Sequence, residues 1–181
     1  MSKEESVLEL FLNEPTKQWH FEEILKKAKI SRPQAMLWLR KFASENLINR
    51  IKPKAKMPYY VANHESEDYR IKKKLFALQT MANAGFLRHL ASLPNAKAVI
   101  LFGSMSRWDW YGKSDIDLFI FGNPGKIHVG KYRKKLHREI QTFICKDKEE
   151  LSKMNPALLK NIVEGYIVKG SMDFVKFKLK E

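Results

Sequence analysis

Apolar residues recur at helical spacing in three segments near the N-terminus. These segments cover residues 4–12, 21–29 and 31–46, and each places its apolar side chains on one side of a helix. Pro15 ends the first helix because proline removes a backbone donor, and Pro33 suits the first turn of the third. We therefore expect three short helices, with an extended piece between the first two.

The third of these helices is expected to have one buried and one exposed face. The apolar side chains expected to be buried are Ala35, Met36, Leu39 and Phe42. The polar side chains expected to be exposed are Arg32, Gln34, Arg40 and Lys41. Two strands, over residues 47–52 and 59–63, follow this helix and are joined by a basic turn that contains Lys52, Lys54 and Lys56.

Three helices followed by a two-stranded ribbon resemble a winged helix-turn-helix domain, over residues 1–63. The resemblance implies that the third helix enters the major groove of duplex DNA and that the ribbon reaches the phosphates. Its DNA-binding residues would be Arg32, Gln34, Arg40, Lys41, Lys52, Lys54 and Lys56. A small helical domain with a merely solvated polar face remains the alternative.

The pattern changes after residue 63. A single long helix is expected over residues 66–93, with an apolar stripe through Leu75, Leu78, Met81, Leu87 and Leu90. Pro94 ends it, and residues 97–104 then form an almost wholly apolar segment, which is typical of a strand buried on both faces. Residues 64–94 are therefore predicted to connect an N-terminal domain to a second domain at 95–181.

The segment LFGSMSRWDWYGKSDIDLFIFG, residues 101–122, carries the candidate chemistry. Gly103 and Ser104 directly follow the apolar strand, where a residue without a side chain lets the backbone approach a phosphate closely. Asp115 and Asp117 lie in the next strand and share one face, because alternate residues of a strand point the same way. Two such carboxylates suit a pair of divalent ions.

This combination of an apolar strand, Gly-Ser, a spacer and Ser-Asp-x-Asp resembles the nucleotidyltransferase superfamily typified by DNA polymerase beta. The resemblance covers residues 95–170 and implies nucleoside triphosphate as substrate with Mg2+ or Mn2+ as cofactor. It assigns the triphosphate to Gly103, Ser104, Arg107 and Ser114, and the metal to Asp115 and Asp117.

Family members add a third carboxylate from a neighbouring strand, which helps to deprotonate the acceptor hydroxyl. The strand expected over residues 137–145 offers Glu139 and Gln141 on the same face. Glu139 would complete the metal and catalytic set, whereas Gln141 carries no charge and accepts no proton. The pattern leaves both registers open.

The spacer departs from the family pattern because it is aromatic. Trp108, Trp110 and Tyr111 follow Arg107 closely, and such rings either stack on a base or pack against the long helix. The tail after residue 147 is expected to form two helices, at 148–154 and 157–166, and a closing strand at 173–178. We assign it no chemistry.

The amino-acid composition indicates which kinds of partner and which compartment to expect. Thirty-four Lys and Arg against twenty Asp and Glu give a net charge of +14 in 181 residues, which favours polyanionic partners. The single cysteine, Cys145, excludes an internal disulfide. The N-terminus lacks the pattern of a secretory signal, and no segment has the roughly 18 apolar residues of a membrane span. We expect a cytoplasmic protein with no membrane partner.

The sequence thus predicts an α+β protein of two domains: a winged helix-turn-helix, then an α/β nucleotidyltransferase domain with a short mixed sheet. The expected reaction moves a nucleoside monophosphate from a triphosphate to a hydroxyl. The alternative is a DNA-binding transcriptional regulator whose degenerate second domain only senses a nucleotide. The acceptor, the triphosphate, the DNA sequence and the oligomeric state are left open, with a homodimer as one alternative.

Overall fold

The computed structural model describes residues 2–174, and these form two compact units. The first unit contains residues 2–75 and a short segment, residues 110–113, from later in the chain. The second contains residues 76–109 and 114–174. Each unit is described by itself below.

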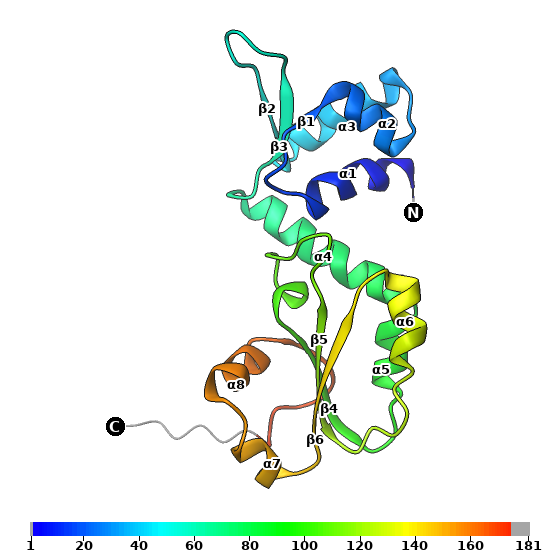
Figure 1. Cartoon of the computed structure of the whole chain (residues 1–181), viewed down its shortest axis with the longest axis vertical. Coiled ribbons are helices and arrows are strands. Elements are labelled where there is room, and N and C mark those ends of the chain that lie inside the picture. Colours follow the sequence, from blue (N-terminus) through cyan, green and yellow to red (C-terminus); the bar gives the residue numbers. More distant parts are fainter. Residues whose placement is uncertain (1, 175–181) are drawn as a thin grey trace, which may run out of the picture. The chain divides into compact units, whose positions relative to one another are not determined.

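The first unit consists of helices and a small antiparallel sheet (Figure 1). Its elements before residue 66 are α1 (Lys3–Asn13), β1 (Trp19–His20), α2 (Phe21–Ala28), α3 (Arg32–Ser44), β2 (Ile48–Ile51) and β3 (Tyr59–Ala62). The strands lie in the order β1-β3-β2. Ser2 and Ser31 begin α1 and α3, since each side-chain oxygen accepts a hydrogen bond from the third residue of its helix. The three helices and the two strands expected here are confirmed.

The core of this unit follows the helical period, with one correction. Ala35, Leu39 and Phe42 of α3 are buried as expected. Met36 is 46% exposed, so its expected burial was wrong. One residue along a helix turns the side chain by about 100°, which carries Met36 away from the face defined by Ala35 and Leu39.

One lysine of this unit is buried. Lys73 of α4 (Glu67–Asn83) is only 1% exposed, and its Nζ lies 4.7 Å from the ring centre of Trp110 and 5.6 Å from those of Tyr69 and Tyr111. Such cation–π contacts stabilise a desolvated ammonium group. Segment 110–113 is also fixed by a 2.9 Å hydrogen bond from Gly112 N to Asn13 O. Trp110 therefore packs against this helix, as one of the two alternatives expected.

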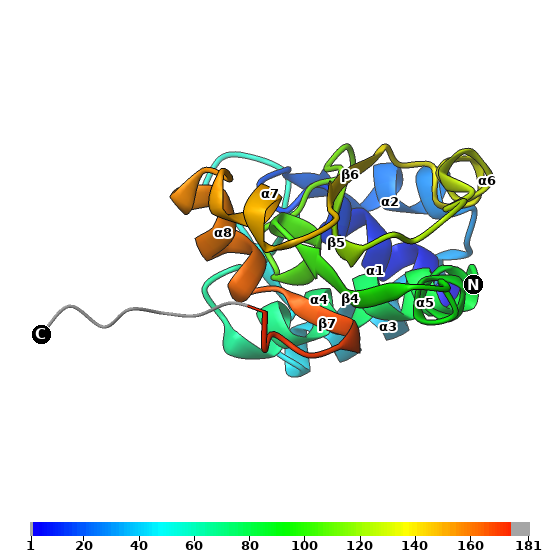
Figure 2. The ribbon, with the colours of Figure 1, turned by 90° about the horizontal axis from the view of Figure 1, so that it is seen from below.

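The second unit is built on a four-stranded mixed sheet in the order β6-β5-β4-β7. The strands are β4 (Ala96–Phe102), β5 (Ile116–Gly122), β6 (Ile140–Cys145) and β7 (Tyr166–Gly170). The helices are α5 (Phe86–Ala91), α6 (Val129–Leu136), α7 (Lys148–Ser152) and α8 (Pro156–Val163). Figures 1 and 2 show α5 and α6 beside one face of the sheet, and α7 and α8 beside the other.

The pairing of the strands decides which residues meet at the end of the sheet. β4 runs antiparallel to both β5 and β7, whereas β5 and β6 are parallel. The end of β4 therefore lies at the same sheet end as the beginnings of β5, β6 and β7. The interior strands are apolar because both of their faces are covered, and every residue of β4 except Lys97 is buried.

The expectation of one continuous helix before the sheet was wrong. The single helix expected over residues 66–93 is divided into α4 and α5, because Gly85 adopts a positive φ of 77° that a continuing helix does not allow. Within its expected apolar stripe, Leu75 is 57% exposed.

The tail also differs from the expectation. The helix expected to reach residue 166 ends at Val163, since Gly165 packs closely on β4 and Tyr166 begins β7. Of the closing strand expected at 173–178, residues 173 and 174 form a turn and the remainder lies outside the described residues.

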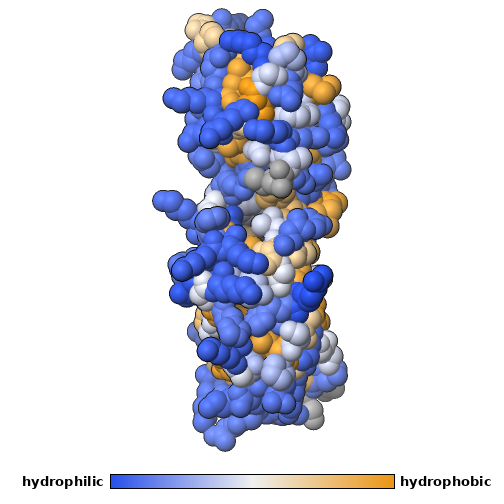
Figure 3. Space-filling model, turned by 90° about the vertical axis from the view of Figure 1, so that its right-hand side faces the viewer, coloured by the Kyte–Doolittle hydropathy of each residue, from blue (hydrophilic) through white to orange (hydrophobic). Residues whose placement is uncertain are grey.

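Hydrophilic residues cover most of the face of the molecule drawn in Figure 3, in keeping with the excess of lysine and arginine. Within residues 2–174, no helix combines the length and the apolar character that a membrane crossing requires.

Candidate active site

Gly103 forms a sharp turn directly after β4. Its φ of 71° lies in the region that favours glycine, and a Cβ at this position would lie against Oδ2 of Asp117. The next three residues form a short 3-10 turn, Ser104–Ser106, which is fixed by a 2.9 Å hydrogen bond from Ser106 Oγ to Gly103 O. The absence of a side chain at Gly103 is thus what allows the turn and the aspartate to come together.

Asp117 lies opposite the end of β4, because it pairs with Phe102. Its neighbours Ile116 and Leu118 are buried, whereas Asp115 and Asp117 are only partly buried and share the alternate face of the strand. The structure therefore brings Gly103, Asp115 and Asp117 to one end of the sheet, although eleven residues lie between Gly103 and Asp115 in the chain.

Burial raises the pKa of the Asp117 carboxyl above its ordinary value, and repulsion by Asp115 adds to the rise. The charge of Arg107 opposes it. A carboxylate that is partly desolvated beside a like charge is unfavourable in the protein alone and becomes favourable when a cation lies between the two groups.

We expect this raised pKa to be visible in the pH dependence of stability. The folded chain binds the Asp117 proton more tightly than the unfolded chain, so the stability of the wild type falls as pH rises from about 4 through the folded pKa of Asp117. Asp117→Asn lacks this titration. In urea unfolding between pH 4 and pH 7, the stability of the wild type relative to Asp117→Asn should therefore decrease with pH and then become constant. A relative stability that stays level or increases would contradict this assignment.

The neighbouring strand presents Gln141 beside the two aspartates. Gln141 pairs with Asp117 in the parallel register of β5 and β6, and its Nε2 donates a 2.6 Å hydrogen bond to Asp115 Oδ2. Glu139 precedes β6, and its Oε2 is 3.0 Å from Arg133 Nε of α6. Of the two residues left open by the sequence, the structure thus brings Gln141 to the aspartates and places the Glu139 carboxylate on Arg133.

Asp115, Asp117 and Gln141 supply two carboxylates and one amide. Hard cations such as magnesium take oxygen ligands of this type and usually retain several waters. Within residues 2–174, no cluster of three or more His, Cys, Asp or Glu side chains is arranged to hold a metal ion. The donor set therefore fits a magnesium ion that is also held by its substrate, and does not form a closed protein site.

Arg107 and Ser114, the other predicted triphosphate ligands, have protein partners. Arg107 forms two hydrogen bonds to Asp109, with Nε 3.2 Å from Oδ1 and Nη2 3.0 Å from Oδ2. The carbonyl oxygen of Ser114 accepts a 2.8 Å hydrogen bond from Arg138 Nη1. The Asp109 carboxylate was not among the predicted site residues, although its position two residues after Arg107 is a usable signal for an ion pair.

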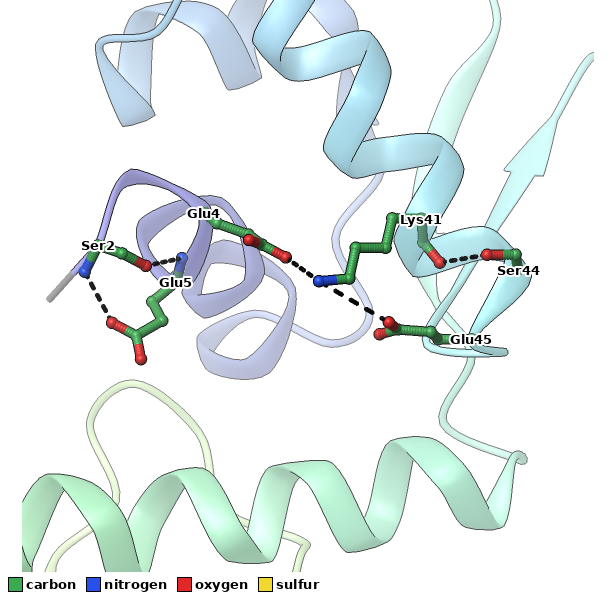
Figure 4. Close-up of polar contacts among 6 residues, drawn as sticks. All are labelled: Ser2, Glu4, Glu5, Lys41, Ser44 and Glu45. Atoms are coloured by element: carbon green, nitrogen blue, oxygen red, sulfur yellow. Dashed lines mark hydrogen bonds and ion pairs between the residues drawn. The ribbon is translucent and has the colours of Figure 1, made fainter.

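A separate candidate interface lies in the first unit, where several predicted DNA-binding residues have intramolecular partners. Arg32 Nη2 is 2.6 Å from Glu22 Oε1, and the side chain of Gln34 caps α3 at Ser31. Lys41 Nζ, from α3, is 2.6 Å from Oε1 of Glu4 in α1, and Figure 4 shows these two side chains pointing toward one another. All seven predicted residues are exposed, as expected, and Lys52, Lys54 and Lys56 lie in the hairpin of β2 and β3.

Comparison with known families supports the assignment of the second unit. Residues 87–172 match the family described as "Polymerase beta, Nucleotidyltransferase". No curated protein and no solved structure matches the chain.

The mixed sheet, the Gly103 turn and the aspartate pair thus lie within the segment that is similar to polymerase beta nucleotidyltransferases. The matched residues, 87–172, make up slightly less than half of the chain. This similarity suggests nucleotidyl transfer with a nucleotide substrate.

Proposed function

We propose that the second unit transfers a nucleoside monophosphate from a nucleoside triphosphate to a hydroxyl, with release of pyrophosphate and with magnesium as cofactor. The observation that carries this proposal is the contact between Gly103 and Asp117, because it joins a turn suited to phosphate with a carboxylate suited to a cation. Manganese has similar ligand preferences and is a second candidate cofactor.

In this proposal the backbone at Gly103 and Ser104 holds the triphosphate, and Arg107 and Ser114 contribute further contacts. Asp115 and Asp117 hold magnesium, which when bound neutralises the phosphates and lowers the pKa of the attacking hydroxyl. The acceptor oxygen forms a bond to the α-phosphorus while the bond to pyrophosphate breaks. Gln141 is able to orient the acceptor or a water molecule but not to take its proton, so the proton leaves to solvent and turnover is slow.

The test is incubation of the purified chain with each α-labelled triphosphate, magnesium and a cell extract. Label that becomes attached to a macromolecule or small molecule only in the presence of the protein and magnesium supports transfer and identifies the acceptor class. Absence of any labelled product, with triphosphate binding retained, contradicts transfer.

A second candidate is a nucleotide-binding regulator without transfer activity. It is favoured by one observation, the position of Gln141 where a third carboxylate would act as a base. Under this candidate, a triphosphate binds with magnesium and is recovered unchanged.

For the first unit we propose a winged helix-turn-helix that binds duplex DNA. The order of three helices and a hairpin supports this proposal, as do the exposed Arg40 and the hairpin lysines. Because Arg32, Gln34 and Lys41 already have partners, we assign most of the affinity to phosphate contacts of the hairpin.

Replacing the three hairpin lysines by alanine should reduce the salt dependence of DNA binding. Each phosphate contact releases counterions, so loss of three contacts should lower the slope of log K against log salt by up to about 2.7. The measurement is a fluorescence anisotropy titration of a labelled duplex with the full-length chain at several salt concentrations. The charge-matched control replaces three exposed lysines of the second unit: Lys126, Lys146 and Lys148. Equal slopes for both triple variants would contradict the role of the hairpin.

A further inference from the structure

Arg107 is held by a carboxylate whose two oxygens accept hydrogen bonds as two oxygens of a phosphate group would. The two oxygens of Asp109 accept from Nε and Nη2 of the guanidinium, at 3.2 and 3.0 Å. This paired arrangement is the one with which arginine binds phosphate oxygens. A triphosphate and Asp109 therefore compete for the same donors.

The surroundings of Arg107 are acidic beyond Asp109. The pKa of the Arg107 guanidinium is raised, chiefly by its hydrogen bonds to the Asp109 carboxylate. The charges of Asp109, Glu164 and Asp117 also stabilise the charged guanidinium. Glu164 directly follows α8, and the pairing of Leu101 with Tyr166 brings it to the sheet end where Gly103 lies. A negatively charged substrate approaching this end meets carboxylates unless Arg107 is directed toward it.

The pair is able to open because it is accessible. The side chains of Arg107 and Asp109 are 39% and 44% exposed, and solvent screens an ion pair with this exposure so that it is weak. Such an interaction is strong enough to lower the apparent affinity of a competing ligand, and weak enough for a triphosphate to displace it.

We propose that Asp109 is a positioning residue that keeps Arg107 away from the triphosphate until substrate displaces it. The inference rests on the proposed triphosphate site and extends it. Asp109 sets the affinity for the triphosphate through Arg107, without itself contacting the substrate.

The test is binding of inorganic tripolyphosphate with magnesium, measured by calorimetry on the full-length chain. Tripolyphosphate presents the phosphate chemistry alone, so the result does not depend on which base the site accepts. The proteins compared are the wild type, Asp109→Asn, Arg107→Ala, the double variant and Asp117→Asn. Glu149→Gln serves as a charge control, since its carboxylate is exposed and pairs with Lys153.

We expect Asp109→Asn to bind about three- to fivefold more tightly than the wild type, and Glu149→Gln to bind with unchanged affinity. In the Arg107→Ala background, the gain from Asp109→Asn should fall below about twofold, because the arginine that it releases is absent.

An unchanged or weaker affinity of Asp109→Asn overturns the proposal, and so does an equal gain in both backgrounds, which would indicate simple charge repulsion. The proposed triphosphate site has its own test. If Asp117→Asn binds tripolyphosphate as tightly as the wild type, tripolyphosphate binds elsewhere and the proposed site is wrong. Absence of binding to the wild type at millimolar concentration overturns both proposals.

Discussion

Gln141→Asp is expected to raise nucleotidyl transfer by about 100-fold or more. The substitution places a carboxylate beside Asp115 and Asp117, at the position that now donates a hydrogen bond to Asp115. A positioned general base contributes about 100-fold to 10,000-fold, and Gln141 cannot act as one because an amide does not accept a proton at neutral pH. The measurement is the initial rate of pyrophosphate release with the acceptor identified from the cell extract, or with water if none is found.

The control for this prediction is Glu139→Gln. The Glu139 carboxylate pairs with Arg133 on α6, so its loss should leave the rate within about twofold of the wild type, as expected for an exposed ion pair. A Glu139→Gln variant that loses turnover, together with a Gln141→Asp variant that gains none, would show that Glu139 acts as the base and that the strand moves when substrate binds.

Asp117→Asn is expected to weaken magnesium-dependent triphosphate binding by more than about 100-fold. The substitution keeps the shape of the side chain beside Gly103 and removes the charge that we propose holds the cation. A bound metal supplies several kcal/mol of charge stabilisation. Binding of each of the four common ribonucleoside triphosphates would be measured by calorimetry with and without magnesium.

The fold of Asp117→Asn should survive, because the replacement relieves the repulsion between Asp117 and Asp115. A loss of binding that accompanies unfolding would therefore not count in favour of the assignment, and circular dichroism of the variant provides this check. Binding with wild-type affinity and unchanged magnesium dependence would exclude Asp117 as a metal ligand.

Much of the candidate site was accessible from the sequence because its signals are local. The apolar strand before Gly103, and the alternation of Asp115 and Asp117 with buried residues, each depend on a few neighbouring positions. The division of the long helix at Gly85 was not predicted, although its cause is local. Gly85 lies within an otherwise helical pattern, and a single glycine does not reliably interrupt a helix.

The choice between Glu139 and Gln141 could not be made from the sequence. Both residues lie on one face of the strand expected over residues 137–145, and the register against β5 depends on how the whole strand pairs. Glu164 was missed for a similar reason, since only the antiparallel pairing of β7 with β4 brings it to the sheet end. The boundaries of α8 and β7 depend on the packing of Gly165 against Ile100 and Leu101, which the local sequence does not indicate.

The proposed triphosphate site is tested most directly by nuclear magnetic resonance. The 15N-labelled full-length chain is titrated with each nucleoside triphosphate, with and without magnesium, and the backbone amide signals are followed. The account predicts saturable shifts for at least one triphosphate at residues 103–107 and 115–117, and their loss when magnesium is removed. Amide signals that do not move in these two segments, or that move equally without magnesium, would contradict a metal-dependent triphosphate site at this end of the sheet.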